Sequence, residues 1–558
     1  MHNNHPPARP PWWIRAADLI AGALFALALV SIVTGGVRIS LGGLVLSVTR
    51  PQPPLIEASV ILLIRAVIWR GAGAIRRLPL VLILAVFMVG LVSDSTPRRV
   101  GDASEYMAMA MSLGRLSGPA VAASDIDDFS YAVWARDYGF TMVSPGLRGQ
   151  DTRQDFTHFW FYPLLAAPFV RLAEAAGAHP NYGFAALNVL LLLATTWVLC
   201  RRLDVASVLL LVGGPIIWWL DKAHTEVFTF SMLAMGLILL KDSPWWTMVA
   251  FGAAATQNPP FVAAFALALA WAVFVQRRRD ARVWGGAAAG IALALLHPLY
   301  YALRLGIWSP LRPAVVPHWP GMAELTAVLW DPNLGILVFT PVFTLTVAVG
   351  LVALVVKTRA RLASHELWFA AFLGVFFLFS FAQTGNANSG ATFNPSRYGL
   401  WLLPLALPLL VRINEAWGAD RTHWLHVAAV LALVHASLMF QPRFSENYVK
   451  PSRPARWLWT THPSFDNPLP EVFSERVSER DSEAVLPIAT AGCEKALLAG
   501  EGSGEVAWPP QCRPEPVPPE CARPGALCYA NRAASGHTFA RAPSQPAFSY
   551  ALASSRQR

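Results

Sequence analysis

Long runs of apolar residues, separated by short polar connections, fill most of this chain. A helix needs about 20 apolar residues, within a range of roughly 17–25, to cross the hydrocarbon core of a membrane. Runs close to that length predict membrane-spanning helices at residues 17–34, 55–69, 78–93, 183–199, 205–220, 225–240, 283–303, 334–356, 366–383, 398–413 and 424–440.

A longer apolar stretch at 243–275 carries Asn258-Pro259-Pro260 near its middle. Basic residues flank it at both ends, which places both ends on the cytoplasmic side. We therefore expect a tight helical hairpin there, and an all-α polytopic membrane protein with about 13 transmembrane helices. Residues 1–441 would form the membrane domain, whereas the Pro-rich region 442–558 would be small, irregular and exported, with a disordered end after about Arg532.

The basic clusters between the apolar runs predict one orientation. Lys and Arg gather in cytoplasmic loops, and every cluster lies inside when the N-terminus is cytoplasmic and the C-terminus is outside. Loop 94–182 then lies on the outer side of a bacterial-type cytoplasmic membrane. Its apolar segment 158–176 is expected to be an interfacial helix, because a crossing there would turn all later clusters outward.

The composition supports a membrane protein and excludes other classes. Of the 558 residues 55% are hydrophobic and 14% are charged, whereas soluble domains carry roughly 25% charged residues. The strands of an outer-membrane barrel would alternate polar and apolar residues, which these runs do not. The net charge of +10 does not indicate nucleic acid, because much of the excess falls at the ends of apolar runs. We expect the first span to be retained, since no convincing signal-peptide cleavage site follows the polar start.

The cysteines are unevenly distributed. Cys200 stands alone, and the other four lie in the C-terminal region at Cys493, Cys512, Cys521 and Cys528. An even set in an exported segment is typical of disulfides, with three pairings open. The alternative is a zinc site, although the paired close spacing of such sites is missing.

Two carboxylates begin the first large outer loop. Asp102 and Glu105 lie three residues apart just before a stretch with helical spacing, so they share one face. One interpretation is a capping box, in which Asp102 caps the helix and Glu105 reaches back to its amide. The other is that a carboxylate beside the membrane accepts a proton from an acceptor hydroxyl.

Further polar motifs follow at the predicted outer ends of spans. The first motif of the series is Gly-Asp-x-x-x-Tyr, which ends at Tyr106. The later motifs are Phe159-Trp160-Phe161-Tyr162-Pro163, His224-Thr225-Glu226, Asp331-Pro332-Asn333-Leu334-Gly335 and Asn394-Pro395-Ser396-Arg397-Tyr398. Their order resembles the polyprenyl-phosphate-sugar-dependent membrane glycosyltransferases of the GT-C superfamily, such as protein mannosyltransferases and bacterial aminoarabinose transferases. The resemblance covers roughly residues 12–440 and implies a GT-C-like fold.

The resemblance also implies an activity. A sugar would pass from a polyprenyl-phosphate carrier to a glycan, lipid or protein acceptor on the outer face of the membrane, with inversion at the anomeric carbon. Asp102 would be the base that activates the acceptor, and Glu105 would assist it or help to hold a divalent cation, Mg²⁺ or Mn²⁺. A nucleotide sugar is not expected as the donor, since no Gly-rich phosphate loop is present. No nucleic acid is expected as a partner, because much of the basic excess falls at the ends of apolar runs.

The lipid phosphate is an anionic leaving group that needs cationic or hydrogen-bonding support. The candidate donor-binding residues are Arg397, Tyr398, His158 and His224, and the candidates for the acceptor side or for support are Tyr106, Glu226 and Asp331.

Each of these residues also has an ordinary structural interpretation. Arg397 can snorkel to the membrane surface, and His158 can be a solvated residue at a helix start. His224 and Glu226 can form a local ion pair with Lys222, and Asp331 can cap the following helix.

Two other functions stay open at this point. A transporter or flippase for a lipid-linked or polar solute would use broken helices such as the one at Asn258-Pro259-Pro260. An assembly factor would act through the exported region 442–558 and would not need the carboxylates.

Overall fold

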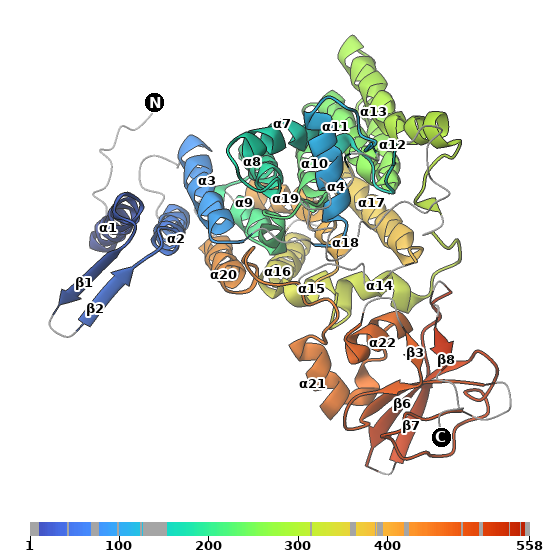
Figure 1. The fold of residues 1–558 in the computed structure, drawn as a ribbon. Coiled ribbons are helices and arrows are strands. Elements are labelled where there is room, and N and C mark those ends of the chain that lie inside the picture. The colour runs from blue at the N-terminus through green and yellow to red at the C-terminus, as the bar shows by residue number, and fades with distance from the viewer. Residues whose placement is uncertain are drawn as a thin grey trace. The chain divides into compact units, whose positions relative to one another are not determined.

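The chain folds mostly into helices, with a small sheet near its C-terminus (Figure 1). The structure is a computed structural model, and it describes residues 11–41, 44–68, 77–96, 100–122, 125, 153–312, 315–357, 364–385, 387, 394–417, 423–480, 484–501, 506–534, 536–546, 548 and 550–552. The first of two compact units comprises Met1–Pro310, Val342–Ala371 and Leu403–Phe444, and the second comprises Leu311–Pro341, Phe372–Leu402 and Ser445–Arg558. Part of the predicted outer loop 94–182 and the last residues of the chain lie outside the described residues.

The first unit begins with three apolar helices and a β-hairpin. The helices are α1 (Trp12–Thr34), α2 (Gln52–Ile68) and α3 (Arg77–Ser93), in agreement with the apolar runs. Between α1 and α2 the antiparallel strands β1 (Val37–Leu41) and β2 (Leu44–Val48) form a hairpin that the sequence analysis did not predict.

Four helices, two of them within the predicted outer loop 94–182, surround one core. They are α4 (Ala103–Gly114), α7 (Phe161–Ala175), α8 (Asn181–Leu199) and α10 (Glu226–Leu239). Helix α7 packs against α4 and α8, and α8 packs against α10 (Figure 1). Met107, Tyr162, Phe184 and Phe228 are buried together in this core. The segment predicted as an interfacial helix is thus helical in α7, and its place in a membrane stays a prediction.

The predicted break at Asn258-Pro259-Pro260 is present. Helix α11 (Pro244–Gln257) ends there, and a 3-10 turn η4 (Pro259–Phe261) leads into α12 (Val262–Ala270), which packs against α11 and continues as a π-helical turn η5 (Trp271–Val275). Proline cannot donate the backbone hydrogen bond of an interior helical position, so the helix stops. Helix α13 (Ala281–Leu305) then packs on α11.

The contact between α11 and α13 requires glycine. A Cβ atom placed on Gly252 would lie 2.6 Å from the carbonyl oxygen of Gly290, and one on Gly290 would lie 2.8 Å from that of Met248. Small residues let helix backbones approach closely, which is the main source of helix packing in membranes.

Two expected spans are interrupted. The run 205–220 forms only α9 (Val205–Val212) and a 3-10 turn η3 (Pro215–Trp219), because Gly213, Gly214 and Pro215 end the helix. The run 334–356 forms α15 (Ile336–Phe339) and, after a break before Pro341, α16 (Pro341–Lys357). The prediction of continuous spans was wrong for both runs. Residues 205–212 are almost entirely buried in protein, which satisfies the condition under which broken helices occur at membrane depth.

Five helical stretches are long and apolar enough to cross a membrane in the described part of the chain: α1, α8, α13, α17 (His365–Ala382) and Arg397–Ala416. The last consists of α18 (Arg397–Leu400), a 3-10 turn η8 (Leu403–Ala406) and α19 (Leu407–Trp417). Shorter apolar helices include α3, α10, α16 and α20 (His423–Met439).

The second unit contains a four-stranded antiparallel sheet in the order β4-β5-β6-β7. Its strands are β4 (Ile488–Ala489), β5 (Lys495–Ala499), β6 (Leu527–Ala533) and β7 (Gly536–Arg541). The parallel pair β3 (Val485–Leu486) and β8 (Ala551–Leu552) lies beside it. Its helices include α14 (Met322–Trp330), α21 (Arg453–Thr461) and α22 (Pro470–Ser478), and a 3-10 turn η10 (Pro463–Phe465) follows α21. The expectation of disorder directly after Arg532 was wrong, because β6 and β7 pair across it.

Strand β5 is buried on both faces. Successive side chains of a strand point to opposite sides, and here Leu497 packs with Tyr529 and Trp459 on one side. Leu498 packs with Ala530 on the other. A strand between two apolar layers explains why an alternating pattern does not reveal it in the sequence.

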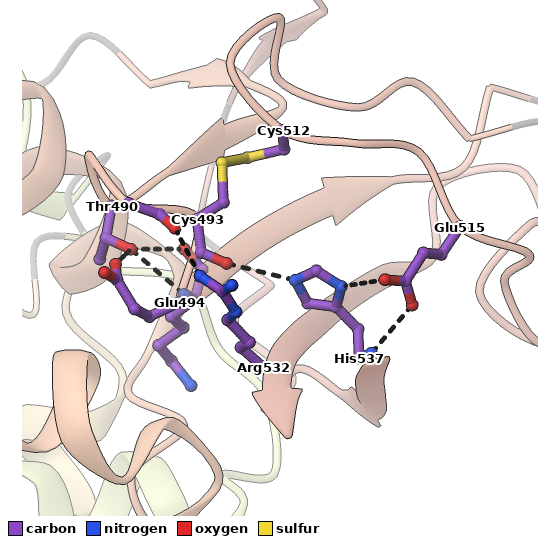
Figure 2. Close-up of a disulfide and its surroundings, with 9 residues drawn as sticks. Thr490, Cys493, Glu494, Cys512, Glu515, Arg532 and His537 are labelled. Atoms are coloured by element: carbon purple, nitrogen blue, oxygen red, sulfur yellow. Dashed lines mark hydrogen bonds and ion pairs between the residues drawn. A yellow bond between two sulfur atoms is a disulfide. The ribbon is translucent and has the colours of Figure 1, made fainter. Parts of the chain in front are cut away.

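Two disulfides join neighbouring cysteines, Cys493 to Cys512 and Cys521 to Cys528, whereas Cys200 is a free thiol. Figure 2 shows the first bridge beside His537, whose imidazole lies 3.2 Å from the carbonyl oxygen of Cys493. The predicted disulfides are therefore present, and they indicate an extracytoplasmic location for this region.

Lys495 is a fully buried cation in the second unit. Its ammonium group donates to the carbonyl oxygen of Pro463 at 2.8 Å, to Asn467 at 2.6 Å and to Asn531 at 2.5 Å, and it lies 4.3 Å from the centre of the Tyr529 ring. Burial lowers the pKa of Lys495 to about 7, against an attraction to Asp466 that raises it.

The stability of the second unit should rise with pH above neutrality. Between about pH 7 and 10 the unfolded chain holds a proton on Lys495 that the folded chain has lost, so the free energy of unfolding increases as pH increases. Lys495→Met should remove this part of the pH dependence. Pulse proteolysis of the full chain in urea, between pH 7 and 10 and in a Cys200→Ser background, measures it, and an unchanged slope in Lys495→Met would contradict the assignment.

The Cys493–Cys512 bridge should stabilise the second unit more than the Cys521–Cys528 bridge. The two sequence separations are 19 and 7 residues, and loop-closure entropy gives about 3 kcal/mol for the longer loop and slightly less for the shorter. Limited proteolysis of Cys493→Ser/Cys512→Ser and Cys521→Ser/Cys528→Ser variants tests the order. Equal resistance of both variants and the parent chain would contradict it.

Candidate active site

The start of α4 presents two carboxylates that do not cap the helix. Asp102 is the N-cap residue, yet its side chain makes no capping hydrogen bond. The Glu105 carboxylate is 1% exposed and accepts a hydrogen bond from the Thr157 hydroxyl at 3.3 Å. The capping-box interpretation is therefore wrong for the side chain of Asp102.

His158 lies between the two carboxylates. Its Nδ1 is 2.9 Å from Glu105 Oε2, and its Nε2 is 3.3 Å from Asp102 Oδ2. An imidazole with both nitrogens against carboxylate oxygens fits the doubly protonated form, in which both nitrogens donate. His158 precedes α7, whose N-cap is Trp160, so it is not the helix cap of the ordinary interpretation.

A second histidine reaches the same aspartate. His224 Nδ1 lies 2.5 Å from Glu226 Oε2, and its Nε2 lies 3.7 Å from Asp102 Oδ2. Carboxylates and imidazoles thus alternate in the order Glu226, His224, Asp102, His158 and Glu105, and we call these five residues the acid–histidine cluster. Asp102 stands at its centre.

Solvent exposure within the cluster is concentrated on Asp102 and His158. The side chains of Glu105, His224 and Glu226 are each 1% exposed, whereas those of Asp102 and His158 are 23% and 20% exposed. A molecule that approaches from solvent therefore meets Asp102 and His158 first.

The aromatic ring of Tyr106 packs against both histidines of the cluster. Its ring centre lies 5.3 Å from that of His158, 5.7 Å from that of His224 and 5.9 Å from that of Tyr162. Tyr162 in turn donates to Asn188 at 2.9 Å. The structure places Tyr106 at the cluster, and its role as a support residue stays a prediction.

Helix α13 fixes the backbone of His158, through residues that the sequence analysis missed. The Tyr301 hydroxyl lies 2.8 Å from the carbonyl oxygen of Phe156 and 3.1 Å from that of His158. One helical turn further along, Arg304 Nε donates to the buried Asp155 carboxylate at 2.5 Å. Tyr300 donates to the same carboxylate at 2.7 Å. The signal available in the sequence was a Tyr-Tyr-x-x-Arg face at the end of an apolar helix.

Lys222 has its own partners. It pairs with Asp221, donates to the carbonyl oxygen of Pro442 at 2.8 Å and lies 4.5 Å from the centre of the Trp218 ring. His224 and Glu226 pair with each other.

Asp331 shapes a turn in the second unit. Its carboxylate accepts a hydrogen bond from the Asn333 amide at 2.7 Å, while the next helix, α15, has Gly335 as its N-cap. Burial raises the pKa of Asp331 to about 7, with a further contribution from the charge of Asp466. Asp331 thus accepts a backbone hydrogen bond, as a capping residue does, but it stabilises the turn after α14 and is not the N-cap of α15.

Arg397 and Tyr398 begin α18, also in the second unit. The Arg397 guanidinium lies 5.4 Å from the centre of the Tyr398 ring, and Tyr398 stacks on Phe381 with centres 5.2 Å apart. Tyr398 lines a shallow, partly open pocket together with Glu324, Ala327, Val328, Leu334, Phe381, Ala382, Thr384, Ala387, Ser396, Leu469 and Gln545. Of the nine predicted catalytic, donor and acceptor residues, the acid–histidine cluster and Tyr106 come together in the first unit, whereas Asp331, Arg397 and Tyr398 belong to the second.

Comparisons of this chain with models of protein families, with curated proteins and with solved structures find no match. A function for this chain therefore has to be inferred from the chemistry of its site residues.

Removal of the Tyr301 hydroxyl should loosen the segment that carries His158. Tyr301→Phe takes away a donor shared by two carbonyl groups, and the loss of a buried hydrogen bond costs about 1–2 kcal/mol, or roughly tenfold in a local opening equilibrium. Hydrogen exchange of peptides that cover residues 153–160 measures this. Tyr182→Phe, on α8, is the matched control, and equal exchange in both variants would contradict the role of Tyr301.

Proposed function

We propose that this protein is a membrane glycosyltransferase that moves a sugar from a polyprenyl-phosphate carrier to an acceptor on the outer face of the cytoplasmic membrane. One observation carries the proposal: Asp102, which makes no capping bond, is partly open to solvent between two histidines that buried glutamates hold. The ordered motifs of the sequence, which resemble GT-C enzymes, add the donor class.

Asp102 is the proposed general base. Its carboxylate takes the proton of an acceptor hydroxyl while the acceptor oxygen forms a bond to the anomeric carbon, and the bond from that carbon to the phosphate oxygen breaks. The electron pair leaves with the polyprenyl phosphate, and the configuration inverts. The arrangement of Asp102, His224 and Glu226 offers a path by which the proton can move away from the reacting centre.

His158 is the proposed electrostatic support for the leaving group. Glu105 holds the Nδ1 of an imidazolium at 2.9 Å, and the proton on Nε2, which lies 3.3 Å from Asp102, can turn to a phosphate oxygen that enters from the solvent side. Arg397 and Tyr398 are still predicted to make a further contact with the sugar donor. Glu105 and Tyr106 orient the histidines.

With His158 in its neutral form, the same residues are instead compatible with a divalent cation. Asp102, Glu105 and His158 each offer one ligand atom, and these atoms lie within 4.8 Å of one another. Ligands of one ion at about 2.0–2.2 Å lie within about 4.4 Å of each other, so a small side-chain adjustment suffices. The two carboxylates of the set suit both Mg²⁺ and Mn²⁺. A bound cation would neutralise charge on the lipid phosphate.

The proposal includes a topology of about 13 spans, an N-terminus inside and both the acid–histidine cluster and the C-terminal region outside. Five stretches long enough to span, several shorter apolar helices and the two disulfides support it. Residues 205–213 are largely buried in protein, so the interruption at Gly213 is compatible with this topology.

A transporter or flippase for a lipid-linked or polar solute is the second candidate. The break between α9 and η3 favours it, since discontinuous helices form solute sites in many transporters. Liposomes that contain the purified protein separate the two: sugar transfer at the outer leaflet supports the enzyme, and movement of the lipid-linked donor between leaflets without transfer supports the transporter.

Asp102→Asn should lower the rate of sugar transfer by about 10²–10⁴-fold, because an amide cannot accept the proton and general-base catalysis contributes about that much. The measurement uses membranes with equal amounts of each variant and a panel of radiolabelled polyprenyl-phosphate hexoses and pentoses. Glu174→Gln is the control, since it removes a carboxylate from α7 that pairs with Arg115 and Arg171 instead of the cluster. Unchanged transfer in Asp102→Asn would refute the proposed base.

A further inference from the structure

The outer face of α21 carries aromatic and basic side chains that the proposed reaction does not use. Trp457 is 57% exposed and Phe465, in the following turn η10, is 79% exposed. His462 links them, with its ring centre 5.2 Å from that of Trp457 and 5.4 Å from that of Phe465. Together with the exposed Arg453 and Arg456, these residues form what we call the α21 patch.

The opposite face of α21 anchors the helix in the second unit. Ala455 and Trp459 are buried, the Trp459 ring centre lies 4.9 Å from that of Phe473, and the Trp459 indole donates to Asp466 at 2.7 Å. Residues at i, i+3 and i+4 share one helix face. Arg453, Arg456 and Trp457 are therefore held on the outer face as long as Trp459 stays inside.

The charges of the patch select an anionic partner. Within the part of the chain that the structure describes, neither Arg453 nor Arg456 forms an ion pair, and the patch contains no carboxylate. Trp and Phe beside Arg on one face of an amphipathic helix is the composition of a segment that lies in the headgroup region of an anionic membrane.

A short connection links α21 to the apolar helix α20. Residues 440–452 join the end of α20, an apolar helix, to the start of α21. A segment this short tethers α21 to any bilayer that α20 crosses, so docking is intramolecular and needs little intrinsic affinity.

We propose that the α21 patch docks on the anionic surface of the membrane in which the protein resides, with Trp457 and Phe465 in the headgroup region and Arg453 and Arg456 on lipid phosphates. This docking is independent of the proposed transferase activity. A carbohydrate platform is the other occupant that exposed aromatic rings suggest, and the experiment below distinguishes it.

The experiment places a nitroxide label beside the patch in the full chain. Ser464, which is exposed and precedes Phe465, is changed to Cys in a Cys200→Ser background, and the protein is placed in nanodiscs of phosphatidylcholine alone or with phosphatidylglycerol. The label should become accessible to oxygen and protected from a soluble nickel chelate when phosphatidylglycerol is present. Arg453→Gln/Arg456→Gln should reduce the ratio of docked to undocked label about 25-fold, since each basic residue near an anionic surface contributes about fivefold.

Charge removal elsewhere on the same unit is the matched control. Arg523→Gln/Arg541→Gln deletes two exposed arginines outside the patch, and it should leave the label protected. Three results would overturn the proposal: a label equally open to the chelate in both lipids, equal docking of both double variants, or protection that requires an added maltooligosaccharide, which would assign the patch to carbohydrate.

Discussion

The burial of Glu105 and Glu226 is the constraint on which the candidate site depends. A carboxylate removed from water needs hydrogen-bonding or charged partners to stay ionised. Each glutamate has an imidazole against it, His158 at 2.9 Å and His224 at 2.5 Å. The second nitrogen of each imidazole then points toward Asp102. Two costly buried acids thus orient two histidines toward the one carboxylate that solvent can reach.

The helices around this cluster give it a fixed frame. The start of α4 supplies Asp102 and Glu105, and the start of α10 supplies Glu226 with His224 in the turn before it. Helix α13 holds the backbone of His158 through Tyr301. Helix α13 is itself locked to α11, because Gly252 and Gly290 allow a backbone contact that a Cβ atom would block. The position of α13, and with it the geometry of the site, therefore depends in part on glycines, which carry no functional group.

The sequence predicts the local features and misses those that need the tertiary fold. The apolar runs predict α1, α8 and α13, and Asn258-Pro259-Pro260 predicts the helix break, because length and proline act locally. Asp102 and Glu105 stand out through their spacing. Their meeting with His158 and His224, and the clamp by Tyr301, bring together residues far apart in the chain. The sheet was missed because its strands are short and β5 is buried on both faces.

The order of the disulfides bears on how the C-terminal region matures. Each cysteine pairs with its immediate neighbour in the chain, the first with the second and the third with the fourth. In a chain that emerges from a translocation channel with its N-terminal end first, every partner arrives before a competing thiol does. Oxidation in order of emergence yields the native pairs directly, so this region requires an oxidant but no reshuffling of wrong bridges.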